Sequence, residues 1–148
     1  MELRRILPGD EPAVLRADHL FDHGRPDRDA VRAYLADARN VLVFAYEGDK
    51  ALGFLRATEL LQLTSRRKQM FLYEIHVDPE FRRQGVGKAL VNALLADCRE
   101  RGFAEVFVLT DPTNAAAVAL YRSTGAVTET EADRMFVFPL HAEPRAHG

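Results

Sequence analysis

The sequence predicts a protein of the α/β (α+β) class, with one mixed β-sheet and helices packed on its faces. Three observations predict this class. Strand-type and helix-type hydrophobic patterns follow one another in the order β-α-α-β-β-β-α-β-α-β. Apolar residues make up 47% of the chain, which is enough for a substantial core. Between Met70 and Arg101, a buried strand leads through a basic, glycine-bearing loop into an amphipathic helix.

The elements of the first half are joined by polar connections. The irregular stretch His19–Asp29 separates two short helices and holds one aromatic residue, Phe21. The turn Glu47-Gly48-Asp49-Lys50 predicts a hairpin. We expect, in order, strand Glu2–Leu7, a short helix capped by Asp10, helix Ala30–Ala38 capped by Asp29, and the hairpin strands Val41–Tyr46 and Ala51–Glu59.

The second half contains the longest helical pattern. Its apolar residues Val86, Leu90, Leu94 and Cys98 recur at helical spacing, and Gly102 ends it. We expect strand Met70–Val77, helix Gly85–Arg101, strand Ala104–Leu109, helix Ala115–Thr124 and a last strand Arg134–Leu140.

Length and composition limit the class of protein. With 148 residues, the chain is expected to form one domain over residues 1–140, followed by a flexible tail at 141–148. A formal charge of −2 argues against broad binding to nucleic acid. Cys98 is the single cysteine, so no internal disulfide can form, and its helical position predicts a core residue. The sequence shows neither a membrane-spanning apolar run nor a signal-peptide core, so a cytoplasmic setting is expected.

The loop before the long helix has the chemistry of a phosphate site. Gly85 and Gly87 allow the backbone to approach phosphate oxygens, and the N-terminus of the helix presents its N–H groups there. Arg82, Arg83 and Lys88 add positive charge at the same end. The sequence therefore indicates a pyrophosphate site, with a plain solvated helix start as the alternative.

Glu74 is a carboxylate in the middle of an otherwise apolar strand. Such a group must be hydrogen-bonded, ion-paired or exposed in a cleft, because burying an unpartnered charge is unfavourable. Strand alternation predicts Leu72, Glu74 and His76 on one face, where two ionisable groups would point toward an acceptor. The other face would carry Phe71, Tyr73, Ile75 and Val77. Glu74 is the first candidate base and His76 the second; structural roles for both are the alternative.

Asn114 and Tyr121 belong to the last expected helix. Asn114 stands at the cap position, and Tyr121 follows it by two helical turns, so that both can face one ligand. The alternatives are a cap without a second role and a core tyrosine.

These features together resemble the GNAT acyltransferase superfamily. Its signature, Gln/Arg-x-x-Gly-x-Gly/Ala, is matched by Arg82, Gly85 and Gly87 within RRQGVG, and NAAAVALY supplies its Asn and Tyr. The resemblance covers about Leu3 to Leu140. It implies the GNAT fold, in which a mixed sheet of about six to seven strands is flanked by about four helices. Ala126 departs from the pattern, because many relatives carry an aromatic residue there.

The resemblance implies an N-acetyltransferase with acetyl-CoA as cosubstrate. It implies that Tyr121 protonates the departing thiolate, while a backbone N–H near Ile75–Val77 stabilises the oxyanion. Its aminoglycoside-modifying members place an Asp as general base at the position of Glu74, which implies that role for Glu74 with its longer side chain. No metal site is expected, because the five histidines show no ligand spacing. The residues implied to bind the coenzyme are Ile75, His76, Val77, Arg82, Arg83, Gln84, Gly85, Val86, Gly87, Lys88, Asn114, Ala117 and Tyr121.

Within the superfamily, LYEIHVDPEFRRQGVGKALVNAL and AVALYRSTGA are similar to aminoglycoside 3-N-acetyltransferases of the type I group. This similarity implies an aminoglycoside acceptor, acetylated on its 3-amino group, and a role in antibiotic resistance. A rim of acids would suit a polycationic sugar, although each acid can equally be a solvated surface group. The candidate acceptor contacts are Glu74, Asp111, His23 and Asp27, with Asp22, Glu59, Glu129, Glu131 and Asp133 as further acids.

Two other functions stay open. One is an N-acetyltransferase that acts on a protein N-terminus, a polyamine or another amine. The other is a coenzyme-A-binding regulatory module, which would need neither Glu74 nor Tyr121. A nucleotide-binding P-loop is excluded because GxxxxGKS/T is absent. The apolar run Met135-Phe136-Val137-Phe138 is either a core strand or a strand shared in a homodimer.

Overall fold

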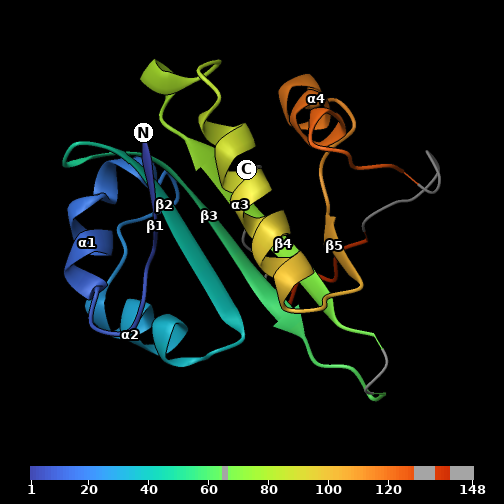
Figure 1. Ribbon diagram of the computed structural model, residues 1–148. Helices are drawn as coiled ribbons and strands as arrows, with labels where there is room; N and C mark the ends of the chain where they lie inside the picture. Colours follow the sequence, from blue (N-terminus) through green and yellow to red (C-terminus); the bar gives the residue numbers. More distant parts are fainter. Residues whose placement is uncertain (65–66, 129–135, 141–148) are drawn as a thin grey trace.

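The computed structural model of the chain describes residues 1–64, 67–128 and 136–140. Within them, a five-stranded sheet has the strand order β1-β2-β3-β4-β5 and is accompanied by four α-helices and two short 3-10 helices (Figure 1). The strands are β1 (Glu2–Arg5), β2 (Asn40–Glu47), β3 (Lys50–Leu60), β4 (Gln69–Val77) and β5 (Glu105–Val108). The helices are α1 (Glu11–Arg16), η1 (Asp18–Leu20), α2 (Arg28–Ala36), η2 (Pro79–Phe81), α3 (Val86–Glu100) and α4 (Ala115–Ser123).

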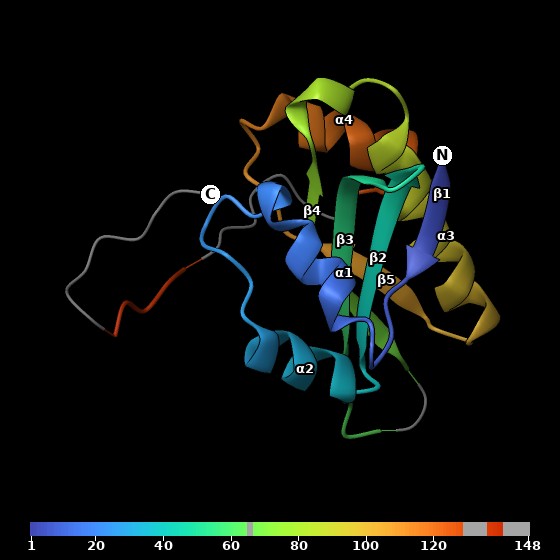
Figure 2. The same cartoon turned by 90° about the vertical axis from the view of Figure 1, so that its left-hand side faces the viewer.

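Neighbouring strands run antiparallel from β1 to β4, and β5 runs parallel to β4. A parallel pair requires a crossover, which α3 supplies. The helices α1 and α2 cover one face of the sheet and α3 covers the other (Figure 1, Figure 2). The sheet is thus the middle layer of three, as the class prediction requires.

Two hydrophobic clusters, one on each face of the sheet, hold these layers together. On the α3 face, Leu90 and Leu94 belong to the same buried cluster as Met70 of β4. On the opposite face, the rings of Phe44 and Phe54 meet edge to face with their centroids 5.8 Å apart. Because helices cover both of its faces, β2 is buried over consecutive residues instead of alternating. Cys98 is buried on the α3 face, which confirms its prediction as a core residue.

The prediction of six to seven strands is wrong for the described part of the chain, where the sheet has five. The expected strand Arg134–Leu140 begins outside the described ranges, and residues 136–140 form no strand. Phe136 and Phe138 are 84% and 85% exposed, so no second layer covers the apolar pattern that predicted a strand. Pro139 also lacks the N–H that a ladder needs. A strand shared in a homodimer stays a prediction, and the expected tail at 141–148 lies outside the described residues.

The first two helices begin differently from their predictions. Before α1, the carboxylate of Asp10 accepts a hydrogen bond from the N–H of Leu7 at 2.9 Å and does not cap the helix. The cap of α2 is Asp27, whose carboxylate accepts from the N–H of the third helical residue at 2.9 Å. Asp29 lies in the first turn, so the helix starts before the predicted Ala30.

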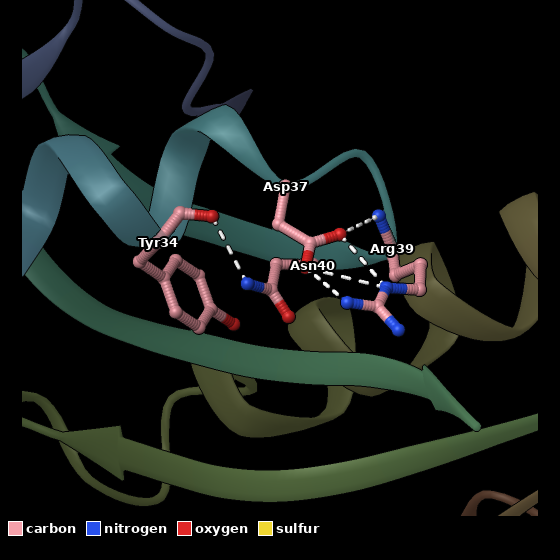
Figure 3. Close-up of polar contacts among 4 residues, drawn as sticks. All are labelled: Tyr34, Asp37, Arg39 and Asn40. Carbon is pink, nitrogen blue, oxygen red and sulfur yellow. Dashed lines mark hydrogen bonds and ion pairs between the residues drawn. The ribbon is translucent and has the colours of Figure 1, made fainter. Parts of the chain in front are cut away.

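A polar turn joins α2 to β2 (Figure 3). The carboxylate of Asp37 accepts hydrogen bonds from the backbone N–H and Nε of Arg39, both at 3.0 Å, and from its Nη2 at 2.6 Å. These bonds lower the pKa of Asp37 to about 2. The Nδ2 group of Asn40 donates to the carbonyl of Tyr34 at 3.0 Å. The turn therefore fixes the end of α2 from which Tyr34 reaches the sheet.

None of the helices in residues 1–64, 67–128 and 136–140 has the length and apolar character of a membrane span. In the same part of the chain, no group of His, Cys, Asp or Glu side chains is placed to hold a metal ion.

Candidate functional site

A β-bulge in β4 sets the direction of the candidate base. Arg56 of β3 pairs with Glu74, while the next residue of β3, Ala57, pairs with Leu72. Tyr73 is therefore an extra residue in β4, and the alternation of side chains shifts by one residue there. As a result, Glu74 and Leu72 lie on opposite faces of the sheet.

The predicted division of β4 into two faces is correct only in part. Glu74 and His76 share the face that α1 and α2 cover. Leu72, predicted on the same face, belongs instead to the core below α3, against which Ile75 also packs. Tyr73, predicted opposite Glu74, lines the same pocket. Simple alternation fails because it does not allow for the extra residue at the bulge.

An arginine of the neighbouring strand holds the Glu74 carboxylate. Nε of Arg56 donates to Oε2 of Glu74 at 2.6 Å, and the two side chains are 35% and 34% exposed. The guanidinium also lies over the ring of Tyr73, 4.1 Å from its centroid. This charge-assisted bond orients the carboxylate while both side chains stay accessible to a ligand.

A pocket of about 590 Å³ opens beside this ion pair. Its walls come from α1, the irregular segment 21–27, α2 and the strands β2, β3 and β4. The structure brings together three of the four predicted acceptor contacts here, Glu74, His23 and Asp27. The volume falls in the range of roughly 300–1,000 Å³ that is typical of small-molecule sites. The apolar side chains of its wall include Val14, Phe21, Val31 and Leu42.

Tyr34 joins the pocket wall to the sheet. Its hydroxyl lies 2.9 Å from the carbonyl oxygen of Val41 and 3.1 Å from that of Ala57, so it donates a hydrogen bond to the paired backbone of β2 and β3. Burial raises the pKa of Tyr34 to about 12. The hydroxyl therefore stays protonated at neutral pH and serves as a donor that anchors α2.

His76 is less accessible than Glu74. Its side chain is 17% exposed, against 34% for Glu74. Nδ1 lies 3.7 Å from Oδ2 of Asp22, and the ring centroid is 6.2 Å from that of Phe54. This packing suits a supporting role, so Glu74 is the better placed of the two candidate bases.

The loop between β4 and α3 has a backbone suited to an anion. Arg83 and Gly85 take positive φ values of 62° and 82°, and Gly85 is the N-cap of α3. The first turn of α3 contains no acidic residue, and Arg83 and Lys88 are exposed. Nε of Arg82 donates to the carbonyl of Val77 at 3.2 Å, which ties the loop back to the end of β4. N–H groups and positive charge therefore converge at this helix end.

The second glycine of the motif brings two helices together. A Cβ atom on Gly87 would lie 3.3 Å from Cδ2 of Leu120 in α4. Tyr121, the next residue, packs against the core on the α3 side, and its burial raises the pKa of its hydroxyl. Oδ1 of Asn114 accepts from the N–H of Ala117 at 3.1 Å, which confirms Asn114 as the cap of α4. Gly87 and Leu120 thus meet beside Val77, the last residue of β4.

The sheet opens between β4 and β5 at this end. Their pairing stops at Leu72 and Val108, so in the described part of the chain β4 has a partner only on its β3 side beyond that point. The two strands diverge toward α4 (Figure 1). Glu74 on one face and Tyr121 on the other are therefore separated by an interrupted sheet.

Of the other predicted acids, Asp22 also lines the pocket, whereas Asp111 does not. The carboxylate of Asp111 accepts hydrogen bonds from the N–H of Thr113 at 2.8 Å and from its hydroxyl at 2.7 Å, and these bonds lower the pKa of Asp111. Glu59 also lies outside the pocket lining. Glu129, Glu131 and Asp133 fall outside the described residues.

Sequence patterns alone do not identify three residues of the pocket, Arg56, Tyr34 and Tyr73. Arg56 follows Phe54 by two positions on β3, and alternation from that core residue would place it on the pocket face. Tyr34 belongs to the apolar stripe of its helix, which predicts a core role. Tyr73 reaches the pocket only through the bulge, for which the sequence has no signal.

Comparison with known proteins identifies the family and the fold of the chain. A family model described as the acetyltransferase (GNAT) family matches residues 7–126. Among solved structures, the chain is similar to an aminoglycoside acetyltransferase from an uncultured soil metagenomic sample, solved in complex with trehalose and with sisomicin. The two share 26% sequence identity with a TM-score of 0.80, over 93% of this chain and 95% of the other.

Relatives by sequence match shorter stretches. N-acetyltransferase 8 of Homo sapiens is 35% identical over 97 residues, which are 66% of this chain and 43% of the relative. The chain thus matches less than half the length of that protein. The ribosomal protein bS18-alanine N-acetyltransferase of Escherichia coli strain K12 is 44% identical over 54 residues, 36% of each chain. Because the family model spans the pocket, the glycine loop and α4, the chain belongs to the acetyltransferase (GNAT) family.

Proposed function

We propose that this acetyltransferase moves the acetyl group of acetyl-CoA onto a primary amine of a small molecule bound beside Glu74. Its family uses acetyl-CoA as cosubstrate, which supplies the acetyl group in an activated thioester. One observation carries the proposal. A partly exposed carboxylate lines a pocket of small-molecule size, on the strand that leads into the glycine-bearing loop.

The residues of the loop fit the diphosphate of coenzyme A. We assign this contact to the segment 82–88, in which Arg82, Arg83 and Lys88 contribute charge and Gly85 turns the backbone toward the ligand. Val86 is buried, so its part is confined to the backbone N–H. Further contacts are proposed for the backbone of Ile75, His76 and Val77, for Gln84 and Gly87, and for Asn114, Ala117 and Tyr121.

Two side chains are proposed to move the protons. Glu74, directly or through water, accepts a proton from the ammonium form of the acceptor and so frees the lone pair that attacks the acetyl carbonyl. Tyr121 donates a proton to the departing thiolate; burial suits it to this role because it keeps the hydroxyl protonated at neutral pH. A backbone N–H of Ile75–Val77 stabilises the oxyanion. The acceptor and the acyl donor meet in the opening between β4 and β5.

An aminoglycoside is the acceptor that the solved neighbours favour, since one of them was solved with sisomicin. Acetylation of its 3-amino group is the finer form of this proposal. The pocket gives weaker support to a polycation, because Arg25 and Arg56 stand beside the acids that line it. A protein N-terminus is the second candidate acceptor, favoured by the similarity to the bS18-alanine enzyme.

A panel of amines with acetyl-CoA tests the proposal, with release of the free thiol as the readout. The panel holds sisomicin, a polyamine, a peptide with N-terminal alanine and single amino acids. We expect thiol release that depends on one of these classes. If acetyl-CoA binds in calorimetry but none of the amines is acetylated, the chain is a coenzyme-A-binding regulatory module and not an enzyme for these amines.

A further inference from the structure

Arg56 offers more hydrogen-bond donors to the pocket than the protein uses. A guanidinium carries five N–H donors in a planar fork. Within residues 1–64, 67–128 and 136–140, the hydrogen bonds of its side chain run through Nε alone, to Glu74. The guanidinium is partly exposed, lines the pocket and is kept in place by the ring of Tyr73. Its two terminal amino groups are therefore available to a bound ligand.

Glu74 places an acceptor next to these donors. In the described part of the chain, its hydrogen bond to Arg56 uses Oε2, which leaves Oε1 for a ligand. The pocket thus presents a carboxylate oxygen and guanidinium N–H groups side by side. The complementary ligand carries an ammonium and a carboxylate close together, since each charge then meets its opposite.

Three other charged side chains of the pocket have partners within the protein. The carboxylate of Asp27 caps α2, and that of Asp22 lies 3.7 Å from Nδ1 of His76. Nε of Arg25 lies 3.8 Å from Oδ2 of Asp18. The side chains of Asp22 and Arg25 are more exposed to solvent, at 66% and 87%. The pair of Arg56 and Glu74 differs from them because it places unused donors and an unused acceptor side by side, in a pocket whose wall is rich in apolar side chains.

We propose that the acceptor is a free amino acid or a close analogue with an apolar or aromatic side chain. Its α-amine meets Glu74, its α-carboxylate is bound by the terminal amino groups of Arg56, and its side chain packs on Phe21, Val31 and Leu42. Arg56 is thereby a specificity-determining residue. This inference rests on the proposed function and narrows its acceptor. A polycation would bring additional positive charge against Arg56, and a simple amine would leave the Arg56 donors unused.

Matched substrates test the inference on the unmodified enzyme. L-phenylalanine, its amide and phenethylamine share the aromatic body and the primary amine, and only the first has a carboxylate. We expect kcat/KM for the free amino acid to exceed that for the other two by about tenfold or more, as expected for a charge-assisted contact. Equal use of the three compounds, or a preference for phenethylamine or sisomicin, would overturn it. This comparison needs no variant, so it holds even if a variant fails to fold.

Variants of Arg56 test the assignment of the residue. Arg56→Gln should remove the preference for the free amino acid, and Arg56→Lys, which keeps the charge but not the fork, should keep part of it. Arg28→Gln is the matched control, because Arg28 is an exposed arginine of α2 outside the pocket lining. A preference that survives Arg56→Gln would overturn the role of Arg56. A lack of acetylation of every amine would overturn the proposed function itself, whereas acetylation without the carboxylate preference would overturn this inference alone.

Discussion

At the scale of single residues, Glu74 is expected to carry most of the proton transfer. Glu74→Gln keeps the size of the side chain and an acceptor for Arg56 but removes the base. We expect kcat to fall by about 10²–10⁴ while the affinity for acetyl-CoA, measured by calorimetry, stays nearly unchanged. Glu100→Gln, at an exposed position at the end of α3, is the matched control and should keep full activity. Unchanged turnover in Glu74→Gln would move the base role to His76.

Tyr34 is a residue whose contribution depends on pH. Losing its hydrogen bond in Tyr34→Phe should lower the free energy of unfolding by about 1 kcal/mol at neutral pH. Its pKa is raised by burial from 10.0 to about 12, so the folded state favours the protonated hydroxyl. This stabilisation is complete below pH 10 and is lost as the pH rises through about 12, so the wild type should lose its advantage over Tyr34→Phe in that interval.

Urea unfolding of both proteins at neutral pH and between pH 10 and 12 measures this difference. Tyr73→Phe is the control, because Tyr73 is 57% exposed and should contribute little. A difference between wild type and Tyr34→Phe that stays constant across the alkaline range would contradict the assignment.

At the scale of elements, sequence patterns predict the long elements well and the local irregularities poorly. The helix Gly85–Arg101 and the hairpin of β2 and β3 were predictable because a full apolar face repeats at one period. The bulge at Tyr73 has no such signature, since it depends on how β3 and β4 pair. The contact of Arg56 with Glu74 could not be predicted from the sequence for the same reason, because the register of two strands is a tertiary property.

The glycine loop depends on a backbone conformation that residues with a Cβ atom rarely adopt. Gly85 has a φ of 82°, and no atom lies within 4 Å of an added Cβ, so the effect of Gly85→Ala is local backbone strain. We expect a loss of roughly 1–2 kcal/mol in urea unfolding and weaker binding of acetyl-CoA in calorimetry. Gly85→Asn should lose less, because Asn tolerates this conformation better. An alanine variant as stable as the wild type would show that the loop relaxes freely.

At the scale of the whole molecule, the three-layer arrangement and the two cores follow from composition and the order of elements. The number of strands does not, because Phe136 and Phe138 satisfy a strand pattern without a layer to cover them. The candidate site has parts that were predictable from the sequence and parts that were not. The glycine loop, Asn114 and Tyr121 were predictable from local motifs, while the pocket required the meeting of α1, α2 and three strands.

The same architecture makes the central strands β2 and β3 more stable against local opening than β5 and α4. The strands β2 and β3 are paired on both sides, whereas β5 pairs with β4 over four residues and α4 has no buried residue in the described chain. Segments with little buried surface open at lower free energy, so amide exchange should be faster in β5 and α4 than in β2 and β3. Acetyl-CoA bound at the loop and α4 should slow amide exchange there. At a hundredfold excess over Kd it should raise the free energy of opening by up to about 2.7 kcal/mol. Exchange measured by mass spectrometry checks this, with α1 as the internal control. Equal protection of α1 by acetyl-CoA, or slow exchange of α4 without ligand, would contradict this difference in local stability.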